Sequence, residues 1–221
     1  MEVLFETEIK EKLSELKVLV VEANITNRPS GADVVELLER TEREIASILE
    51  LGDVKNRPGI AATRAAYKIL GKDPNRYRPS TEALCRRIVR GLGLYRVDAA
   101  VDVINVLSIL TGYSIGGFDA DKIEGNVITL GVGREGEPYE AIGRGQLNIS
   151  ALPVFRDVIG GIGTPTSDNE RTKLSVDSRH LLMTINIYGE DMPVMQTEEL
   201  TRQLLETYLD ATDIKFKIVT P

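Results

Sequence analysis

The chain has 221 residues, which is enough to bury a substantial core as one large domain or as two small ones. Its N-terminal octet, Met-Glu-Val-Leu-Phe-Glu-Thr-Glu, is acidic where a secretory signal would be basic, and no apolar run approaches the roughly 20 residues that span a membrane, so we expect a cytoplasmic protein. A single cysteine, Cys85, and a single histidine, His180, exclude an internal disulfide and argue against a cysteine- or histidine-based metal cluster, so no metal or cofactor is expected.

The average charge conceals a strongly basic segment. The formal net charge of −7 argues against a protein that coats nucleic acid. Between Lys55 and Arg96, however, eleven basic residues stand against two acidic ones, a net of +9, and the rest of the chain carries −16. A solvated helical face and a surface that follows nucleic-acid phosphates both explain such a segment.

Periodicity and turn residues predict the order of the elements. In the first half of the chain they indicate a strand over 17–25 and helices over 32–51, 58–71, 80–91 and 98–112. In the second half they indicate strands over 126–132, 139–142, 152–159, 180–188 and 213–219, with one helix over 197–209 and a flexible stretch over 160–165. The pattern is typical of an α+β fold with a mostly antiparallel sheet. We expect residues 1–57 to form a strand–helix extension that packs on a core made by residues 58–221.

The helix predicted over 98–112 leads into a glycine-rich stretch. Asp98 is a suitable N-cap, and Gly112 can end the helix in a left-handed conformation. Asn105 lies among apolar residues one turn to either side, so its amide needs hydrogen-bond partners if it is buried. Gly116 and Gly117 lack side chains, and we expect a flexible loop whose backbone can approach a ligand or another strand. A pocket and a simple helix–turn unit both fit this pattern.

Local motifs do not specify a reaction. His180 has no accompanying Gly-x-Ser-x-Gly elbow and lies near the start of a predicted strand, where a surface position is expected. The run Gly160–Gly163 lacks the Lys-Ser/Thr that follows a phosphate-binding loop. The carboxylates within Asp119–Glu124 fall short of the ligand set of a calcium loop, so a turn explains them. The polar group within Asp168–Lys173 fits a solvated loop and the rim of a site equally well.

A resemblance to a known family rests on three longer runs of sequence. These are Val101-Asp-Val-Ile-Asn105 continuing to Gly112-Tyr-Ser-Ile-Gly-Gly-Phe-Asp-Ala-Asp-Lys-Ile-Glu-Gly125, then Gly133-Arg-Glu-Gly-Glu137, and Thr172-Lys-Leu-Ser-Val-Asp-Ser-Arg-His-Leu-Leu182. They resemble the tRNA-editing domain of bacterial phenylalanyl-tRNA synthetase β chains. Free-standing versions of that domain are more similar still, and share Tyr77-Arg-Pro-Ser80, Ala83-Leu-Cys-Arg-Arg87 and Glu170-Arg-Thr-Lys173. The resemblance covers approximately residues 58–188.

The resemblance implies an α+β fold with helices packed on a β-sandwich-like core, and a pocket for an amino acid esterified to tRNA. In synthetases this domain hydrolyses tyrosine mischarged on the phenylalanine tRNA. Two features depart from the family. Gly116 replaces its histidine and Ser114 its neighbouring proline. The carboxylate that recognises the tyrosine hydroxyl aligns near Met183 or Thr184, neither of which is acidic. A site that loses such a partner loses selectivity of order 10⁴-fold. We therefore expect a smaller or less polar amino acid, or no editing.

The family match assigns binding positions, but no catalytic residue. The expected ligand pocket comprises Asn105, Ser114, Gly116, Gly117, Phe118, Asp119, Thr172 and Thr184. The expected RNA-binding face comprises Arg78, Arg86, Arg87, Arg90 and Arg96.

Three functional hypotheses stay open. The chain, too short for a complete synthetase, is a trans-acting hydrolase of mischarged aminoacyl-tRNA, or a non-catalytic module that binds tRNA or an amino-acid-like ligand. A structural protein that binds a partner through its acidic N-terminal helix has the least support.

Overall fold

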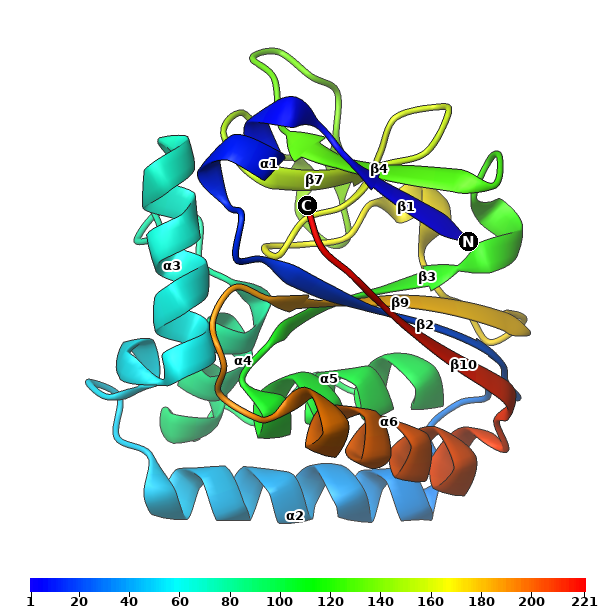
Figure 1. Ribbon diagram of the computed structural model, residues 1–221. Coiled ribbons are helices and arrows are strands. Elements are labelled where there is room, and N and C mark those ends of the chain that lie inside the picture. Colours follow the sequence, from blue (N-terminus) through cyan, green and yellow to red (C-terminus); the bar gives the residue numbers. More distant parts are fainter.

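Two four-stranded sheets stack face to face in the computed structural model, which describes residues 1–221 (Figure 1). The strand order is β1-β4-β7-β8 in the upper sheet and β10-β2-β9-β3 in the lower sheet, and β5 and β6 form a separate hairpin. The strands are β1 (Glu2–Phe5), β2 (Lys17–Asn24), β3 (Ser114–Asp119), β4 (Val127–Val132), β5 (Glu140–Ala141), β6 (Gly145–Gln146), β7 (Pro153–Arg156), β8 (Gly161–Gly163), β9 (His180–Ile187) and β10 (Thr212–Val219). Only β1 and β4 pair in parallel; every other pair is antiparallel.

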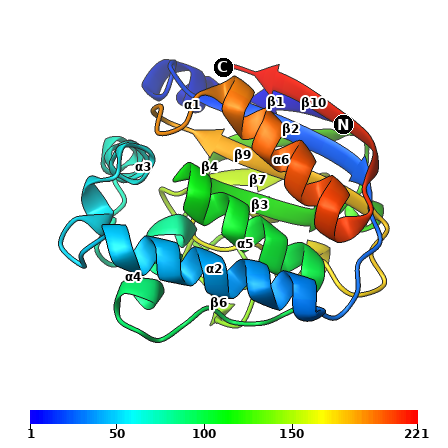
Figure 2. The ribbon, with the colours of Figure 1, turned by 90° about the horizontal axis from the view of Figure 1, so that it is seen from below.

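Helices cover the outer face of the lower sheet. The six α-helices are α1 (Thr7–Lys12), α2 (Ala32–Ile48), α3 (Pro58–Leu70), α4 (Ser80–Val89), α5 (Ala99–Thr111) and α6 (Val194–Leu209). Helices α5 and α6 lie directly on the sheet, α2 packs beneath α5, and α3 stands along one side of both sheets (Figures 1 and 2). None of these helices combines the length and the apolar character that a membrane crossing requires.

The alternation of side chains along β9 divides the core in two. Leu181, Met183 and Ile185 point toward the helices and join the larger apolar cluster, whereas Leu182 joins the cluster between the two sheets. Both faces of the strand are buried because the sheet is covered on both sides. The α+β fold with a mostly antiparallel, sandwich-like core is therefore confirmed.

Most predicted elements are confirmed within a few residues at each end. Helix α5 is bounded as its sequence predicts, because the Asp98 side chain accepts a hydrogen bond from the Val101 N–H at 3.0 Å and Gly112 has a φ of +77°. The two glycine-rich segments expected to be flexible are instead strands, β3 and β8. Glycine has a low strand propensity, so the local sequence hid both of them; pairing with β9 and β7 supplies their hydrogen bonds.

The first 57 residues contribute to both sheets. β1 is an edge strand of the upper sheet, and β2 lies between β9 and β10 in the lower one. The sequence patterns did not indicate β1 or α1, which are only four and six residues long. The division of the chain at residue 57 stays a prediction.

Candidate functional site

A small pocket opens where α5, the edge strand β3 and the segment after β8 meet. Its volume is about 110 Å³. We call it the α5–β3 pocket; its lining residues are Ser80, Ile104, Asn105, Ser108, Ile115, Thr164, Ser167 and Asp168. They come from α4, α5, β3 and the 164–168 segment, so only the tertiary fold brings them together. None of them is a lysine, arginine or histidine.

Asp168 is the only charged residue of the α5–β3 pocket. Its Oδ2 accepts a hydrogen bond from the Gly117 N–H at 3.0 Å. That N–H lies on the edge of β3 that no other strand of the sheet covers, so the carboxylate satisfies it. Burial raises the pKa of Asp168 to about 7, although the hydrogen bond from Gly117 acts in the opposite direction. The pocket therefore holds a carboxyl group that titrates near neutral pH.

The raised pKa of Asp168 gives stability an unusual dependence on pH. In the unfolded chain the pKa of an aspartate is about 3.9. Between that pH and about 7, Asp168 is therefore protonated in the folded state and ionised in the unfolded state. The stability from this group is fully present below the unfolded pKa and is lost as the pH rises through the folded pKa. We expect the unfolding free energy of the wild type, relative to Asp168→Asn, to fall between pH 5 and 7 by at most about 1.4 kcal/mol per pH unit.

Urea denaturation of both proteins across this range measures the difference. Because the side chain is half-buried, solvent screening will reduce the slope below that limit. Parallel stability curves for the two proteins would show that Asp168 does not titrate in this range.

Two uncharged polar side chains of the α5–β3 pocket have no hydrogen-bond partner in the protein: the Ser80 hydroxyl and the Asn105 amide, both half-buried. By contrast, the Ser108 hydroxyl donates to the Tyr113 carbonyl at 2.7 Å, and the Thr164 hydroxyl donates to the Ser167 carbonyl at 3.0 Å. Ser80, Asn105 and Asp168 therefore present free polar atoms to whatever enters the pocket.

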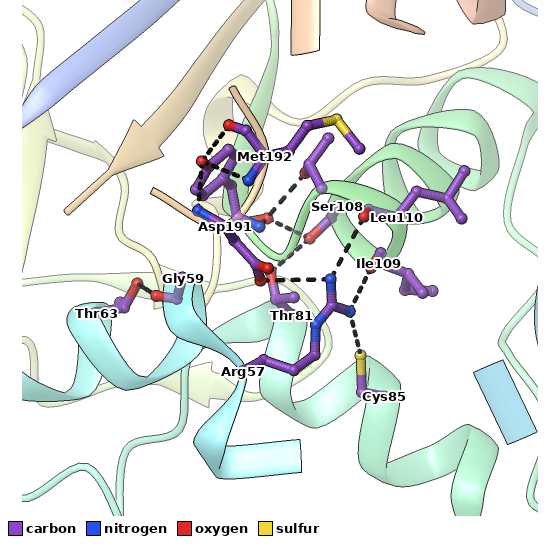
Figure 3. A network of polar contacts seen from close by, with 12 residues as sticks. Arg57, Gly59, Thr63, Thr81, Cys85, Ser108, Ile109, Leu110, Asp191 and Met192 are labelled. Atoms are coloured by element: carbon purple, nitrogen blue, oxygen red, sulfur yellow. Dashed lines mark hydrogen bonds and ion pairs between the residues drawn. The ribbon is translucent and has the colours of Figure 1, made fainter. Parts of the chain in front are cut away.

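An arginine holds the end of the helix that carries Asn105. The Arg57 guanidinium donates to the carbonyls of Ile109 at 2.6 Å and Leu110 at 3.4 Å, and lies 3.4 Å from Asp191 Oδ2 (Figure 3). The last carbonyls of a helix have no partner within it and carry partial negative charge, so a cation stabilises them. This contact fixes the C-terminal end of α5 against α3 and the segment before α6.

Three of the expected pocket residues face the interior between the sheets. Ser114, Gly116 and Phe118 alternate along β3 on its inner face, and all three are buried. A Cβ on Gly116 would lie 2.6 Å from the Phe118 ring and 2.9 Å from the Thr184 hydroxyl, so no side chain fits there. Gly117 faces Ile104 on the opposite side of the sheet, and its N–H donates to Asp168 at the strand edge. Of the expected set, Asn105 lines the pocket and Gly117 adjoins it.

The remaining expected pocket residues lie farther along the fold. Asp119 accepts hydrogen bonds from the Asp121 N–H and the Ser178 hydroxyl at the far end of β3. Thr172 is fully buried, and so is Thr184, whose hydroxyl has no partner. None of Asp119, Thr172 and Thr184 lines the α5–β3 pocket. His180 is exposed, as expected, and contacts Asp121 at 2.8 Å.

Four of the five expected RNA-binding arginines gather in one hollow of about 160 Å³. We call it the arginine groove; its lining residues are Arg76, Arg78, Ala83, Arg86, Arg87, Arg90, Leu92 and Arg144. Arg96 lies outside it and pairs with Glu39 at 3.0 Å. Arg144 comes from the turn between β5 and β6, which is far from the basic segment in the sequence.

The arginines of the groove differ in their contacts with the rest of the protein. Arg86 pairs at 2.8 Å with Glu82, a fully buried carboxylate. The Arg87 guanidinium lies 3.8 Å over the ring of Tyr95, an exposed side chain. Arg90 and Arg144 form no ion pair, and both are exposed. Their charges are therefore available to an anion.

The arginine groove and the α5–β3 pocket adjoin each other. Ser80 lines the pocket and Ala83 lines the groove, and they lie one turn apart on α4, a rise of about 4.5 Å at 1.5 Å per residue. A second link runs through the β5–β6 hairpin, because the Ile142 N–H donates to the Asp168 carbonyl at 3.0 Å. An extended ligand can therefore contact both hollows.

Sequence reasoning missed several residues of these hollows, among them Ser80, Asp168, Arg76 and Arg144. Asp168 was as consistent with a solvated loop as with a site, and only its position opposite Asn105 distinguishes the two. Arg76 lies inside the basic segment, so the charge pattern contained it. Nothing in the local sequence around Arg144 indicates that it joins the same surface.

Comparison with known proteins gives a family and several structural relatives. A family model described as "B3/4 domain" matches residues 62–199. No curated protein matches the sequence. Among solved structures, the chain is similar to an N-terminal fragment of the phenylalanyl-tRNA synthetase β-subunit from Pyrococcus horikoshii, with 12% identity and a TM-score of 0.46. That alignment covers 98% of this chain and 50% of the fragment, so the chain spans about half of its length.

Proposed function

The chain belongs to the B3/4 domain family, which is found in the phenylalanyl-tRNA synthetase β chain, and on this premise we propose that it hydrolyses an aminoacyl ester of tRNA in trans. The observation that carries the proposal is the adjacency of two hollows, a small polar pocket and a groove lined by arginines. An aminoacyl-tRNA end has the matching parts, an amino acid on a phosphate-bearing strand. Such a substrate would place the protein in the cytoplasm.

The arginine groove suits the single-stranded end of a tRNA. Arginines bind phosphate oxygens through paired N–H groups, and base stacking on an aromatic ring adds affinity without sequence preference. Arg87 covers one face of the Tyr95 ring, but Tyr95 is 63% exposed, so a base can stack on its other face. With phosphates in the groove, the terminal ribose would lie near the N-terminal turn of α4, beside the pocket.

Hydrolysis in the α5–β3 pocket requires a water and groups that stabilise charge on the ester carbonyl. Water adds to the carbonyl carbon, the bond to the ribose oxygen breaks, and the amino acid and the tRNA hydroxyl are released. The Asn105 amide and the Ser80 hydroxyl are donors without a partner, so they can orient the water or bind the developing oxyanion. The pocket contains serine hydroxyls but no histidine or lysine to activate them, which favours direct attack by water over a covalent intermediate.

A panel of correctly charged and mischarged tRNAs tests the proposal. We expect the wild type to deacylate at least one of them above the uncatalysed rate, and Asn105→Ala to lower that rate by about 10²-fold, because one oxyanion donor is worth that much. Asn126→Ala, an exposed asparagine outside the pocket, serves as the matched control. No deacylation across the panel would remove the enzymatic function.

A second candidate function is binding without catalysis. The absence of a histidine at Gly116 and of any general base other than Asp168 in the pocket favours it. In that case the charged tRNAs would bind, with an affinity that falls as salt rises, and remain intact. Gel-shift and deacylation measurements on the same samples distinguish the two functions.

A further inference from the structure

We propose that Asp168 binds the protonated α-amino group of the amino acid, so that the α5–β3 pocket accepts free aminoacyl groups and rejects N-acylated ones. The proposal rests on the proposed function, because it identifies which part of an aminoacyl ester the pocket recognises. It names a ligand chemistry, a primary ammonium next to a carbonyl, that neither the family match nor the sequence assigns.

The first argument is that Asp168 is a carboxylate without a cation. No lysine, arginine or histidine lines the pocket, and the one hydrogen bond that Asp168 accepts comes from the neutral Gly117 N–H. A half-buried carboxylate that lacks a cationic partner is costly, and a cationic ligand removes that cost. The α-ammonium is the only cation that an ordinary aminoacyl ester offers next to its carbonyl.

The second argument is the number of free acceptors. A primary ammonium has three N–H donors. Acceptor atoms that no protein donor occupies lie on Asp168, Ser80 and Asn105. The Ser167 hydroxyl, which only donates to the Asp168 carbonyl, adds another, so the pocket can satisfy all three donors. An N-acyl group removes the positive charge, leaves one N–H donor and adds at least two heavy atoms to a pocket of about 110 Å³. The lost charge, the lost N–H donors and the added volume should therefore all lower the affinity for the acylated ligand.

The surroundings of Asp168 contain little else that titrates. Tyr139 is an ionisable group whose pKa Asp168 influences; its hydroxyl donates to the Ser167 carbonyl at 2.7 Å, and burial raises its pKa, so it stays neutral. Glu170 is bound to Lys173 and to the Gly143 N–H, away from the pocket. The pocket's own lining contributes no other charge. The affinity for an ammonium should thus follow the charge of Asp168.

Binding of adenosine analogues tests the inference. The probes are 3′-amino-3′-deoxyadenosine acylated with alanine, serine or threonine, each with its N-acetyl counterpart, because the amide linkage resists hydrolysis. Titration by NMR at pH 7.5 should show the free amine bound at least about tenfold more tightly than the acetylated form. The preference for the free amine should vanish in Asp168→Asn. It should persist in Asp177→Asn, because Asp177 is exposed and lies outside the pocket. Lowering the pH to about 5 should weaken the binding of the free-amine probe to the wild type but not to Asp168→Asn.

Equal binding of the two forms, a preference that survives in Asp168→Asn, or no binding of any amine at millimolar concentration would overturn the inference. The outcome is separable from that of the proposed function. An amine preference without deacylation would leave the inference standing and remove the hydrolase. Equal hydrolysis of aminoacyl-tRNA and its N-acetylated form would keep the hydrolase and remove the inference. The folded state of each variant is checked by its far-UV circular dichroism and its melting temperature.

Discussion

Replacing Glu82 with alanine will lower the unfolding free energy by about 3–5 kcal/mol, the usual result of removing one partner of a buried ion pair. The Glu82 side chain is completely buried. It lies 2.8 Å from Arg64 and 2.8 Å from Arg86, and 3.9 Å from Arg78. Without it, three guanidinium groups of like charge face one another, two of them largely out of water. The loss will be visible as a lower midpoint in urea denaturation.

Two further variants sharpen this prediction. Glu82→Gln keeps the volume and one acceptor, so a smaller loss than in Glu82→Ala would separate the packing contribution from the charge. Glu135→Ala, an exposed glutamate without an ion pair, should change stability by less than about 0.5 kcal/mol. If Glu82→Ala were as stable as Glu135→Ala, the buried network would not hold α3 to α4. We expect the same change to weaken tRNA binding, because Arg78 and Arg86 line the arginine groove.

Removing Arg90 and Arg144, two exposed arginines of the groove that form no ion pair, will weaken tRNA binding roughly tenfold or more without loss of stability. Arg90 and Arg144 form no ion pair in the protein, so their replacement by alanine leaves no buried charge behind. If each binds one phosphate of a single strand, the slope of log K against log salt should become less steep by about 1.4. Filter binding of tRNA over a range of salt concentrations measures both quantities.

The matched control removes the same amount of charge elsewhere. Arg43 and Arg96 both contact Glu39 and lie outside the arginine groove. The Arg43→Ala/Arg96→Ala double variant should keep the salt slope of the wild type. If this control variant loses as much affinity for tRNA as the Arg90→Ala/Arg144→Ala variant, the net charge of the protein alone governs binding. The arginine groove would then not be the tRNA-binding site.

The sequence predicted best where local chemistry decides the structure. Helix α5 is the clearest example, because an aspartate cap, an apolar face and a terminal glycine act within a few residues of one another. The arginines of α4 are likewise adjacent along one helix, so charge counting found most of the groove. The family resemblance, carried by three longer runs of sequence, led to the B3/4 family that the family model confirms.

The sequence failed where a distant segment supplies what the local one lacks. Gly116 and Gly117 have little tendency to form a strand, and β3 exists because β9 pairs with it along its whole length. The pairing also decides which face each residue takes. Gly116 therefore faces the interior between the two sheets, whereas Gly117 faces Ile104 of α5, although the two glycines are neighbours in sequence.

Local sequence thus determined the helices, their ends and the concentration of basic charge, because these depend on interactions between residues a few positions apart. The tertiary structure alone decided that Asp168 lines the same pocket as Asn105 and that Arg144 joins the arginine groove. Both depend on how β8 and the β5–β6 hairpin are held against β3 and α4, and no short-range pattern encodes a contact between such distant segments. The raised pKa of Asp168 follows in turn from that packing, since burial is a property of the fold and not of the residue.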